Sequence, residues 1–324
     1  MTGGSFGRSA MAIELIDGRA DTASVARITS EVLRWLIFEP EAIEHFRAQI
    51  PTRRDWLGLL DGEPVGVGSA AVPVGMEASG VAMSMLFVLR EARHRGIGGL
   101  LHGRVSAHAR SLGRSELLTF SFEDDPDTAG FAERHGFEVV GRTRGLRLPL
   151  DGCPRPELTA PVGVTITTLA EQPDLARGVW EIACEAFPQI PHGGDAPMQA
   201  GDYDEFVAFH LSGPRFIPEA TFVALARDEV VGYAQLAWMS RSGGIADHAM
   251  IAVRDNWRGR GVAQALKAAQ IAWAIDTGLH ELRAGNDESN RPARAVNAHF
   301  PYIPLPDYLA LRGPATPETS PVTR

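Results

Sequence analysis

The fold is decided by VLREARHRGIGGLL, residues 88–101, and by its counterpart VRDNWRGRGVAQAL, residues 253–266. Each stretch leaves an apolar run, passes through a turn of glycine and arginine, and continues with helical spacing of its apolar residues. Glycine lets the backbone approach a ligand closely, and the first N–H groups of a helix have no partner within the helix. Together with the helix dipole, such a turn predicts a site for phosphate or pyrophosphate.

The two turns belong to a long internal repeat. WLGLLDGEPVGVG at residues 56–68 aligns with FVALARDEVVGYA at residues 222–234, an offset of 166. RHRGIG aligns with RGRGVA at an offset of 165, which also carries Gly136-Phe137 onto Pro301-Tyr302. The repeat predicts two domains of one fold. The expected divisions are a disordered start at 1–10, domains at 11–152 and 163–312, a proline-rich linker at 153–162, and a disordered tail at 313–324.

Each copy is expected to run in the same order: strand, helical segment, hairpin, apolar strand, glycine turn, and amphipathic helix. In the first copy these elements fall at residues 12–16, 22–37, 56–68, 80–90 and 96–111. Asp61-Gly62 supplies the positive φ of a two-residue hairpin turn, whereas Arg227-Asp228 is a weaker turn signal. Hairpins mixed with one strand–turn–helix crossover predict a mixed α/β (α+β) sheet and not a doubly wound parallel one.

Composition excludes several classes of protein. The chain has 324 residues, 44% of them apolar, and a net charge of −9, which argues against a nucleic-acid binder. The most apolar stretch, residues 81–89, is too short to span a bilayer, and the start does not resemble a secretory signal. Two cysteines exclude a disulfide framework and a four-cysteine zinc site. We therefore expect a cytoplasmic protein with no membrane partner and no metal.

Both glycine turns match Q/R-x-x-G-x-G/A, the signature of the GNAT acetyltransferase superfamily, and the chain resembles the tandem members over most of residues 11–312. The resemblance implies two mostly antiparallel, twisted sheets with splayed central strands, and acetyl-CoA or another acyl-CoA as acyl donor. Its pyrophosphate would lie on Arg93, His94, Arg95, Gly96, Ile97, Gly98 and Gly99, or on Arg258, Gly259, Arg260, Gly261, Val262 and Ala263. Its pantetheine arm would follow Leu86, Phe87 and Val88, or Ile251, Ala252 and Val253. A main-chain N–H there would polarise the thioester carbonyl.

The two copies differ where chemistry is expected. At the start of the apolar strand the first copy reads Ala82-Met83-Ser84, whereas the second reads Asp247-His248-Ala249. Asp247 or His248 could act as general base there. By alternation, Asp247 would share a strand face with Ala249 and Ile251, and His248 would lie on the other face. The alternative is an exposed strand end.

The family's usual tyrosine acid is missing from both copies. Its position is Ala132 in the first copy and Asn297 in the second, so Tyr302 is a displaced candidate, with core packing as the alternative. Asn286 and Asn290 resemble an asparagine pattern that contacts the cofactor arm in some GNAT proteins, and helix capping is their alternative. The acidic loop at residues 191–206 could favour a cationic acceptor, or could simply be solvated.

The leading hypothesis is an acyl-CoA-dependent N-acetyltransferase acting on the amine of a small molecule. Chemistry is assigned to the second domain, with acyl-CoA held structurally or regulatorily in the first. The opposite assignment stays open because the first copy keeps RxxGxG and Gly-Phe. The missing tyrosines favour an alternative, a non-catalytic acyl-CoA-binding or sensing protein with two degenerate GNAT domains. A thiol-cofactor synthase of the tandem group would be expected to keep the tyrosine in its second domain.

Overall fold

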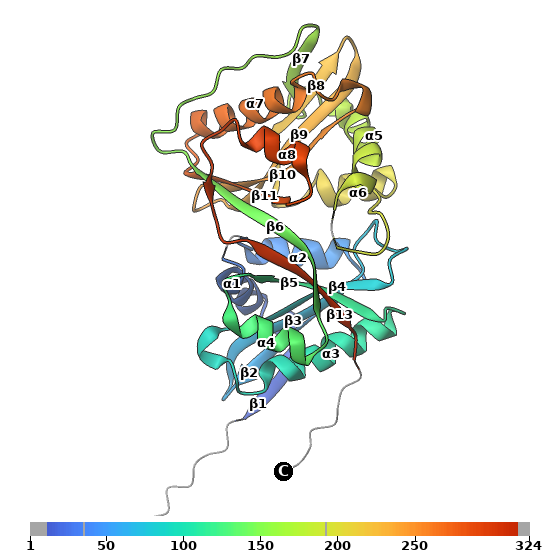
Figure 1. Ribbon diagram of the computed structural model, residues 1–324, viewed down its shortest axis with the longest axis vertical. Helices are drawn as coiled ribbons and strands as arrows, with labels where there is room; N and C mark the ends of the chain where they lie inside the picture. Colours follow the sequence, from blue (N-terminus) through green and yellow to red (C-terminus); the bar gives the residue numbers. More distant parts are fainter. Residues whose placement is uncertain (1–11, 35, 192, 317–324) are drawn as a thin grey trace, which may run out of the picture.

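The computed structural model describes residues 12–34, 36–191 and 193–316 and forms two lobes, one for each half of the chain (Figure 1). The N-terminal half contains β1 (Ile13–Asp17), α1 (Thr22–Val32), α2 (Pro40–Gln49), β2 (Arg54–Leu60), β3 (Glu63–Ala71), β4 (Val81–Val88), α3 (Ile97–Ser111), β5 (Glu116–Phe122), α4 (Pro126–Arg134) and β6 (Glu138–Pro149). The C-terminal half contains β7 (Val164–Thr168), α5 (Ala176–Ala186), α6 (Tyr203–His210), β8 (Phe216–Ala226), β9 (Glu229–Ser240), β10 (Ile245–Val253), α7 (Val262–Asp276), β11 (Glu281–Asp287), α8 (Arg291–Asn297), β12 (Ile303–Pro304) and β13 (Tyr308–Pro314).

The predicted mixed sheet is confirmed. The strands follow the order β1-β2-β3-β4-β5-β13-β6-β11-β10-β9-β8-β7. Neighbours are antiparallel except β4–β5 and β10–β11, which are parallel and pair over only three residues each. After Met83 and after Asp247 the paired strands part. Each half therefore opens a gap between its two central strands, at the end that leads to the glycine turn.

The two halves exchange their closing strands. β13, from the end of the chain, lies between β5 and β6 in the lower lobe of Figure 1, while β6 also pairs with β11 of the other half. Each gap is thus flanked by a strand from the opposite half. β13 runs to Pro314, beyond the expected end of the second domain at 312. The expected disordered start at 1–10 lies outside the described residues, as do residues 317–324 of the tail expected at 313–324.

Local signals explain most element boundaries. Asp61 and Gly62 adopt φ values of 51° and 87°, the hairpin turn that the sequence predicts. Arg227 also has a positive φ, 56°, at the second hairpin. The segment expected to be helical over 22–37 ends earlier, because α1 stops at Val32 and a new helix starts with Pro40 at its first position.

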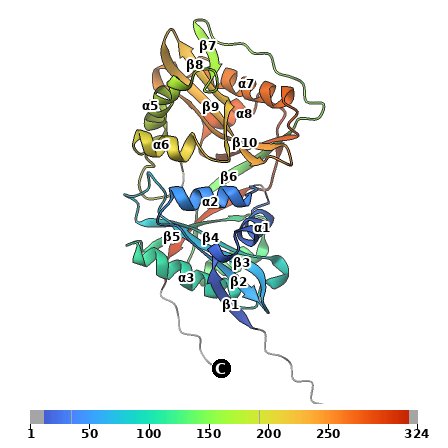
Figure 2. The ribbon, with the colours of Figure 1, turned by 180° about the vertical axis from the view of Figure 1, so that it is seen from behind.

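Helices cover both faces of the sheet. In the N-terminal half, α1 packs on the face of Val67 and Phe87, and α3 packs against the other face over Gly66 and Gly68. The C-terminal half repeats this arrangement, with α5 on the face of Ala252 and α7 on the face of Val253. Helices α1, α2, α5 and α6 lie in front in Figure 2. None of the described helices combines the length and apolar character that crossing a bilayer requires.

Candidate functional site

Both glycine turns have the geometry of an anion site. Gly96 precedes α3 with φ 92° and Gly261 precedes α7 with φ 87°, so each helix begins from a left-handed residue. A Cβ on Gly96 would meet no atom within 4 Å, and one on Gly261 would meet only Pro161. The open space before the unpaired N–H groups of each helix fits the pyrophosphate of an acyl-CoA.

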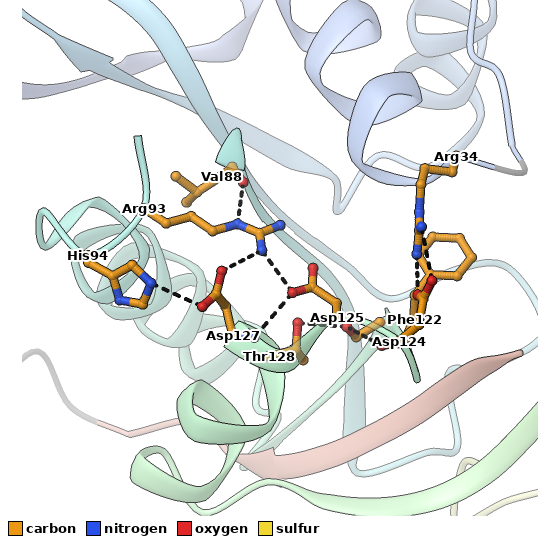
Figure 3. Close-up of polar contacts among 10 residues, drawn as sticks. Arg34, Val88, Arg93, His94, Phe122, Asp124, Asp125, Asp127 and Thr128 are labelled. Carbon is orange, nitrogen blue, oxygen red and sulfur yellow. Dashed lines mark hydrogen bonds and ion pairs between the residues drawn. The ribbon is translucent and has the colours of Figure 1, made fainter. Parts of the chain in front are cut away.

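The first arginine of each turn braces the turn against the preceding strand. Arg93 donates its Nε–H to the carbonyl oxygen of Val88 at 3.1 Å, and Arg258 donates in the same way to Val253 at 3.1 Å. In the N-terminal half the remaining charge of Arg93 is paired with Asp125 at 2.8 Å and Asp127 at 3.0 Å (Figure 3). This guanidinium therefore holds the backbone of the turn in place and is largely neutralised.

A cavity of about 320 Å³ opens between β4 and β5 in the N-terminal half. Its walls come from β4, β5, the turn, α3 and α4, and from Leu311 of the exchanged strand β13. Most residues predicted to bind acyl-CoA in this half line it: Leu86, Phe87, Val88, Arg93, His94, Gly96, Ile97, Gly98 and Gly99. Arg95 is not among the lining residues. A largely apolar cleft that ends at a phosphate turn suits the pantetheine arm and its pyrophosphate.

Ion pairs connect the segment that follows β5 to the turn after β4 and to the end of α1 (Figure 3). The pairs of Arg93 with Asp125 and Asp127 connect the turn after β4 to the start of α4. Arg34 adds a second tie, since it pairs with Asp124 and lies over the ring of Phe122 at 4.2 Å. The C-terminal half lacks the first tie, because Asn290 and Pro292 stand in the places of the two aspartates and Arg258 bonds Gln189 instead.

Replacing Asp125 and Asp127 together by asparagine should speed the release of acyl-CoA from the N-terminal cavity about tenfold. The change removes two charge-assisted hydrogen bonds, whose strength partial exposure reduces. Exchange of unlabelled for isotopically labelled acetyl-CoA, followed by native mass spectrometry, measures the rate. Asn290→Ala, at the counterpart of Asp125, is the matched control and should leave it unchanged. Release that is not accelerated would contradict the closing role of these ion pairs.

A β-bulge at Ala249 changes the expected alignment of the two copies. His248 pairs with Leu236 and Met250 with Gln235, which leaves Ala249 without a partner in β9. β4 pairs with β3 without such an interruption. Ser84 pairs with Ala70, 166 positions before Leu236, so His248 is the structural counterpart of Ser84. Asp247 and His248 lie on opposite faces, as alternation predicts, but the expectation that Asp247 shares the face of Ile251 is wrong. The extra residue turns His248 toward α7, the face of Ile251, and Asp247 toward the opposite face.

The bulge brings His248 and Tyr302 together. The Tyr302 hydroxyl lies 2.6 Å from Nε2 of His248, and Nδ1 of His248 lies 2.8 Å from Oε1 of Gln270 in α7. With the Gln270 amide oriented as in this structure, Oε1 accepts, which assigns the proton to Nδ1 of His248 and leaves Nε2 to accept the proton of Tyr302. Burial, together with the nearby Lys267, lowers the pKa of His248 well below its ordinary value. The imidazole is therefore neutral at pH 7 and able to accept a proton.

Asp247 does not join this group. Its carboxylate accepts a hydrogen bond from Arg215 at 2.7 Å on the opposite face of β10. Burial raises the pKa of Asp247, while the charge of Arg215 opposes that rise. The two candidate bases therefore lie on opposite faces of β10, and His248 alone contacts Tyr302.

The asparagines are engaged within the protein. Asn297 donates a hydrogen bond to Asn286, and the counterparts of this pair, Ala132 and Ser121, line the cavity of the other half. Asn290 caps α8 by accepting from the N–H of Ala293. The acidic loop is used in a similar way: Asp195 accepts from the Ser79 hydroxyl, and residues 202 and 205 form the capping box of α6.

Two residues of this region were not predicted from the sequence. Gln270 is fully buried and its amide nitrogen has no hydrogen-bond partner within the described structure. Lys267, one turn earlier in α7, is 2% exposed, and its Nζ lies 5.0 Å from the centre of the Tyr302 ring. The sequence could have indicated them, because two long polar residues interrupt an alanine-rich helix. Their i, i+3 spacing places them on one face of that helix.

Comparison with known proteins agrees with this geometry. The profile of the Acetyltransferase (GNAT) family matches twice, at residues 24–137 and 178–299. A mycothiol acetyltransferase of Thermomonospora curvata is 29% identical over 74% of this chain and 75% of its own length. One from a Nocardioides species is 25% identical over 72% and 79%.

Two solved structures share the fold at full length. A GCN5-related N-acetyltransferase from Sphaerobacter thermophilus has a TM-score of 0.70 at 20% identity, covering 95% of this chain and 98% of its own. A tandem GNAT protein from the clavulanic acid biosynthesis pathway has a TM-score of 0.73 at 18% identity, covering 94% and 99%. At these identities the likeness shows the two-domain fold alone.

Proposed function

Because the chain belongs to the GNAT acetyltransferase family, whose members transfer an acetyl group from acetyl-CoA, we propose that its C-terminal half carries the chemistry. The acceptor is the amine of a small molecule. The N-terminal half binds acyl-CoA in its cavity as a structural or regulatory ligand.

The observation that carries this proposal is the hydrogen bond between Tyr302 and His248 at the point where β10 leaves β11. The same places in the N-terminal half hold Ser84 and Phe137. Burying an imidazole and a phenol costs free energy that apolar side chains avoid. The chain contains this fold twice, once with the His248–Tyr302 pair and once without it. Because the fold forms without the pair, we infer that the pair is present for function.

The residues supply the two requirements of amine acetylation. The acceptor amine must lose a proton during acetylation. The Tyr302 hydroxyl takes that proton while it passes its own proton to Nε2 of His248. The thioester carbonyl needs a hydrogen-bond donor, and the backbone N–H groups at the bulge around Ala249, where β10 has left β11, are the candidates. Asp247 is the weaker candidate for the base, because Arg215 holds its carboxylate on the other face.

The turn of the C-terminal half is assigned to the acyl-CoA that reacts, with the residues 258–263 around its pyrophosphate and Ile251, Ala252 and Val253 along its arm. The curated relatives are named for mycothiol, but Asn297 stands where the sequence analysis expects the tyrosine of a thiol-cofactor synthase. We therefore assign the acceptor only as a small-molecule amine.

Valine substitutions at the two turns test the assignment of the halves. A β-branched residue is strained at positive φ, so Gly96→Val and Gly261→Val should each disrupt one turn. We expect Gly261→Val to lower acyl transfer at least about tenfold while keeping, in native mass spectra, the CoA adduct of the N-terminal half. Gly96→Val should remove the adduct of the N-terminal half and retain transfer. Loss of transfer in Gly96→Val alone would assign the chemistry to the N-terminal half.

A further inference from the structure

Lys267 is the single lysine of the chain, and its position is unusual for a lysine. It lies on the face of α7 that packs against the sheet and is 2% exposed. Within the described residues it forms no ion pair or hydrogen bond, and its Nζ lies over the face of the Tyr302 ring. Buried lysines are almost always paired, so an unpaired amine at this place calls for an explanation.

The N-terminal half shows what lies beside this position. The counterpart of Lys267 is His102, which contacts the rings of His135 at 4.3 Å and Phe137 at 5.8 Å. Both of these rings, together with the adjacent Leu101, line the cavity between β4 and β5. Tyr302 is the counterpart of Phe137, so Lys267 packs against the residue that corresponds to a wall of the N-terminal cavity.

The surroundings also place Lys267 close to the point where β10 and β11 part. Its neighbour Tyr302 is bonded to His248, the last residue of β10 before the bulge, where β10 and β11 have just parted. The phosphate turn is at the other end of the same strand segment. A donor that binds along this segment from the turn presents its acyl end toward His248.

Burial keeps the amine of Lys267 in its reactive form. Removal from water lowers the pKa of Lys267 to about 7, because the ammonium loses its hydration and gains no counter-charge. Near neutral pH a large fraction is therefore the free amine, which is a nucleophile. The side chain is 2% exposed and its Nζ lies over the Tyr302 ring, so little water is present to compete for a thioester.

We propose that Lys267 is a self-acylation site, at which Nζ takes the acyl group of the acyl-CoA bound in the C-terminal half. The lone pair of Nζ forms a C–N bond to the carbonyl carbon, and the C–S bond breaks with its electron pair on sulfur. The proton lost from nitrogen goes to the thiolate, so the products are an Nζ-acyl lysine and free CoA. No other reactant is needed. The inference rests on the proposed binding of acyl-CoA in this half.

Intact-mass measurement and peptide mapping test the proposal without a known acceptor. The purified chain is mapped before and after incubation with acetyl-CoA at pH 8. We expect the gain of one acetyl group on Lys267, with a rate that falls about tenfold for each pH unit below 7. The acetylated peptide should be absent from Lys267→Arg. It should also be lost in Gly261→Val, which keeps the lysine but disrupts the turn.

Two results would overturn the proposal in different ways. If Gly96→Val still binds acetyl-CoA, so that the donor occupies the C-terminal half, and Lys267 stays unmodified, self-acylation is wrong and the proposed function stands. If Gly96→Val binds no acetyl-CoA, the proposed donor site in the C-terminal half is wrong, and the self-acylation proposal fails with it. Equal acetylation of Lys267 in Gly261→Val would show reaction with free acetyl-CoA from solution and would also overturn the proposal.

Discussion

Replacing His248 by alanine should lower turnover by about 10²- to 10⁴-fold, the range that positioned acid–base groups contribute. The loss should appear in kcat, because His248 lies at the reacting end of the cleft and away from the glycine turn. Tyr302→Phe should give a loss of similar size, since it removes the hydroxyl that bonds Nε2 of His248. Release of CoA, followed with a thiol reagent against a panel of small amines, measures both.

The N-terminal half supplies the controls for this prediction. Ser84→Ala alters the structural counterpart of His248 and should leave turnover unchanged. The counterpart of Tyr302 is Phe137, so the N-terminal half naturally has the side chain that Tyr302→Phe introduces. Gln270→Leu should lower turnover less, by about tenfold, because it removes only the partner that fixes the His248 tautomer. Full activity in His248→Ala would remove the C-terminal half from the chemistry.

The pH dependence of the reaction follows from the same contacts. Burial and Lys267 lower the pKa of His248, so the imidazole should stay unprotonated at pH values where an exposed histidine is already charged. We expect kcat to hold nearly constant from pH 7 down to about 6, below the ordinary histidine pKa of 6.5. A fall in kcat centred at 6.5 or higher would contradict a buried base and would favour an exposed group.

Local sequence signals predicted the parts of the fold that depend on neighbouring residues. The hairpin at Asp61-Gly62, the glycine turns before α3 and α7, and the mixed sheet follow from φ preferences, helix starts and periodicity. The exchange of β6 and β13 could not be predicted in this way. Each closing strand has an ordinary strand pattern, and which sheet it joins is decided by contacts between residues such as Ser121 and Leu309, far apart in sequence.

The candidate site shows the same limit at finer scale. A constant offset of 165 aligns Ala82-Met83-Ser84 with Asp247-His248-Ala249. The bulged residue Ala249 shifts this alignment by one position, so that Ser84 corresponds to His248 and the side chains before the bulge point to the opposite faces of the sheet. Alternation is a reliable rule only while the strand ladder is continuous. The hydrogen bond from Tyr302 to His248 joins residues 54 positions apart, so no local sequence pattern predicts it.

Replacing Lys267 by methionine should raise the free energy of unfolding by about 4 kcal/mol at pH 7, approaching about 5 kcal/mol at pH values well below 7. In the folded chain the pKa of Lys267 is about 7, against an ordinary value of 10.5, and each pKa unit corresponds to about 1.4 kcal/mol. Methionine keeps a long, flexible side chain in the same space and needs no hydration. Urea unfolding followed by circular dichroism at several pH values measures the difference.

The sign of the pH dependence makes this prediction specific. Between pH 7 and 10.5 the unfolded chain binds a proton at Lys267 that the folded chain does not, so the stability of the natural chain rises with pH. The advantage of Lys267→Met should therefore shrink steadily and disappear near pH 10.5. His102→Met, the counterpart change, should show no such slope there, because burial lowers the pKa of His102 to about 4.

Few other side chains of this protein titrate in the pH range that the Lys267→Met comparison uses. Lys267 is its single lysine, and burial raises the pKa of both cysteines, Cys153 and Cys184, above the ordinary 9.0. Few side chains other than Lys267 therefore change charge between pH 7 and 9. A slope of stability with pH in this range that is the same in the natural chain and in Lys267→Met would mean that the amine is hydrated or paired in the folded protein. In that case Lys267 could not be the poised nucleophile behind Tyr302.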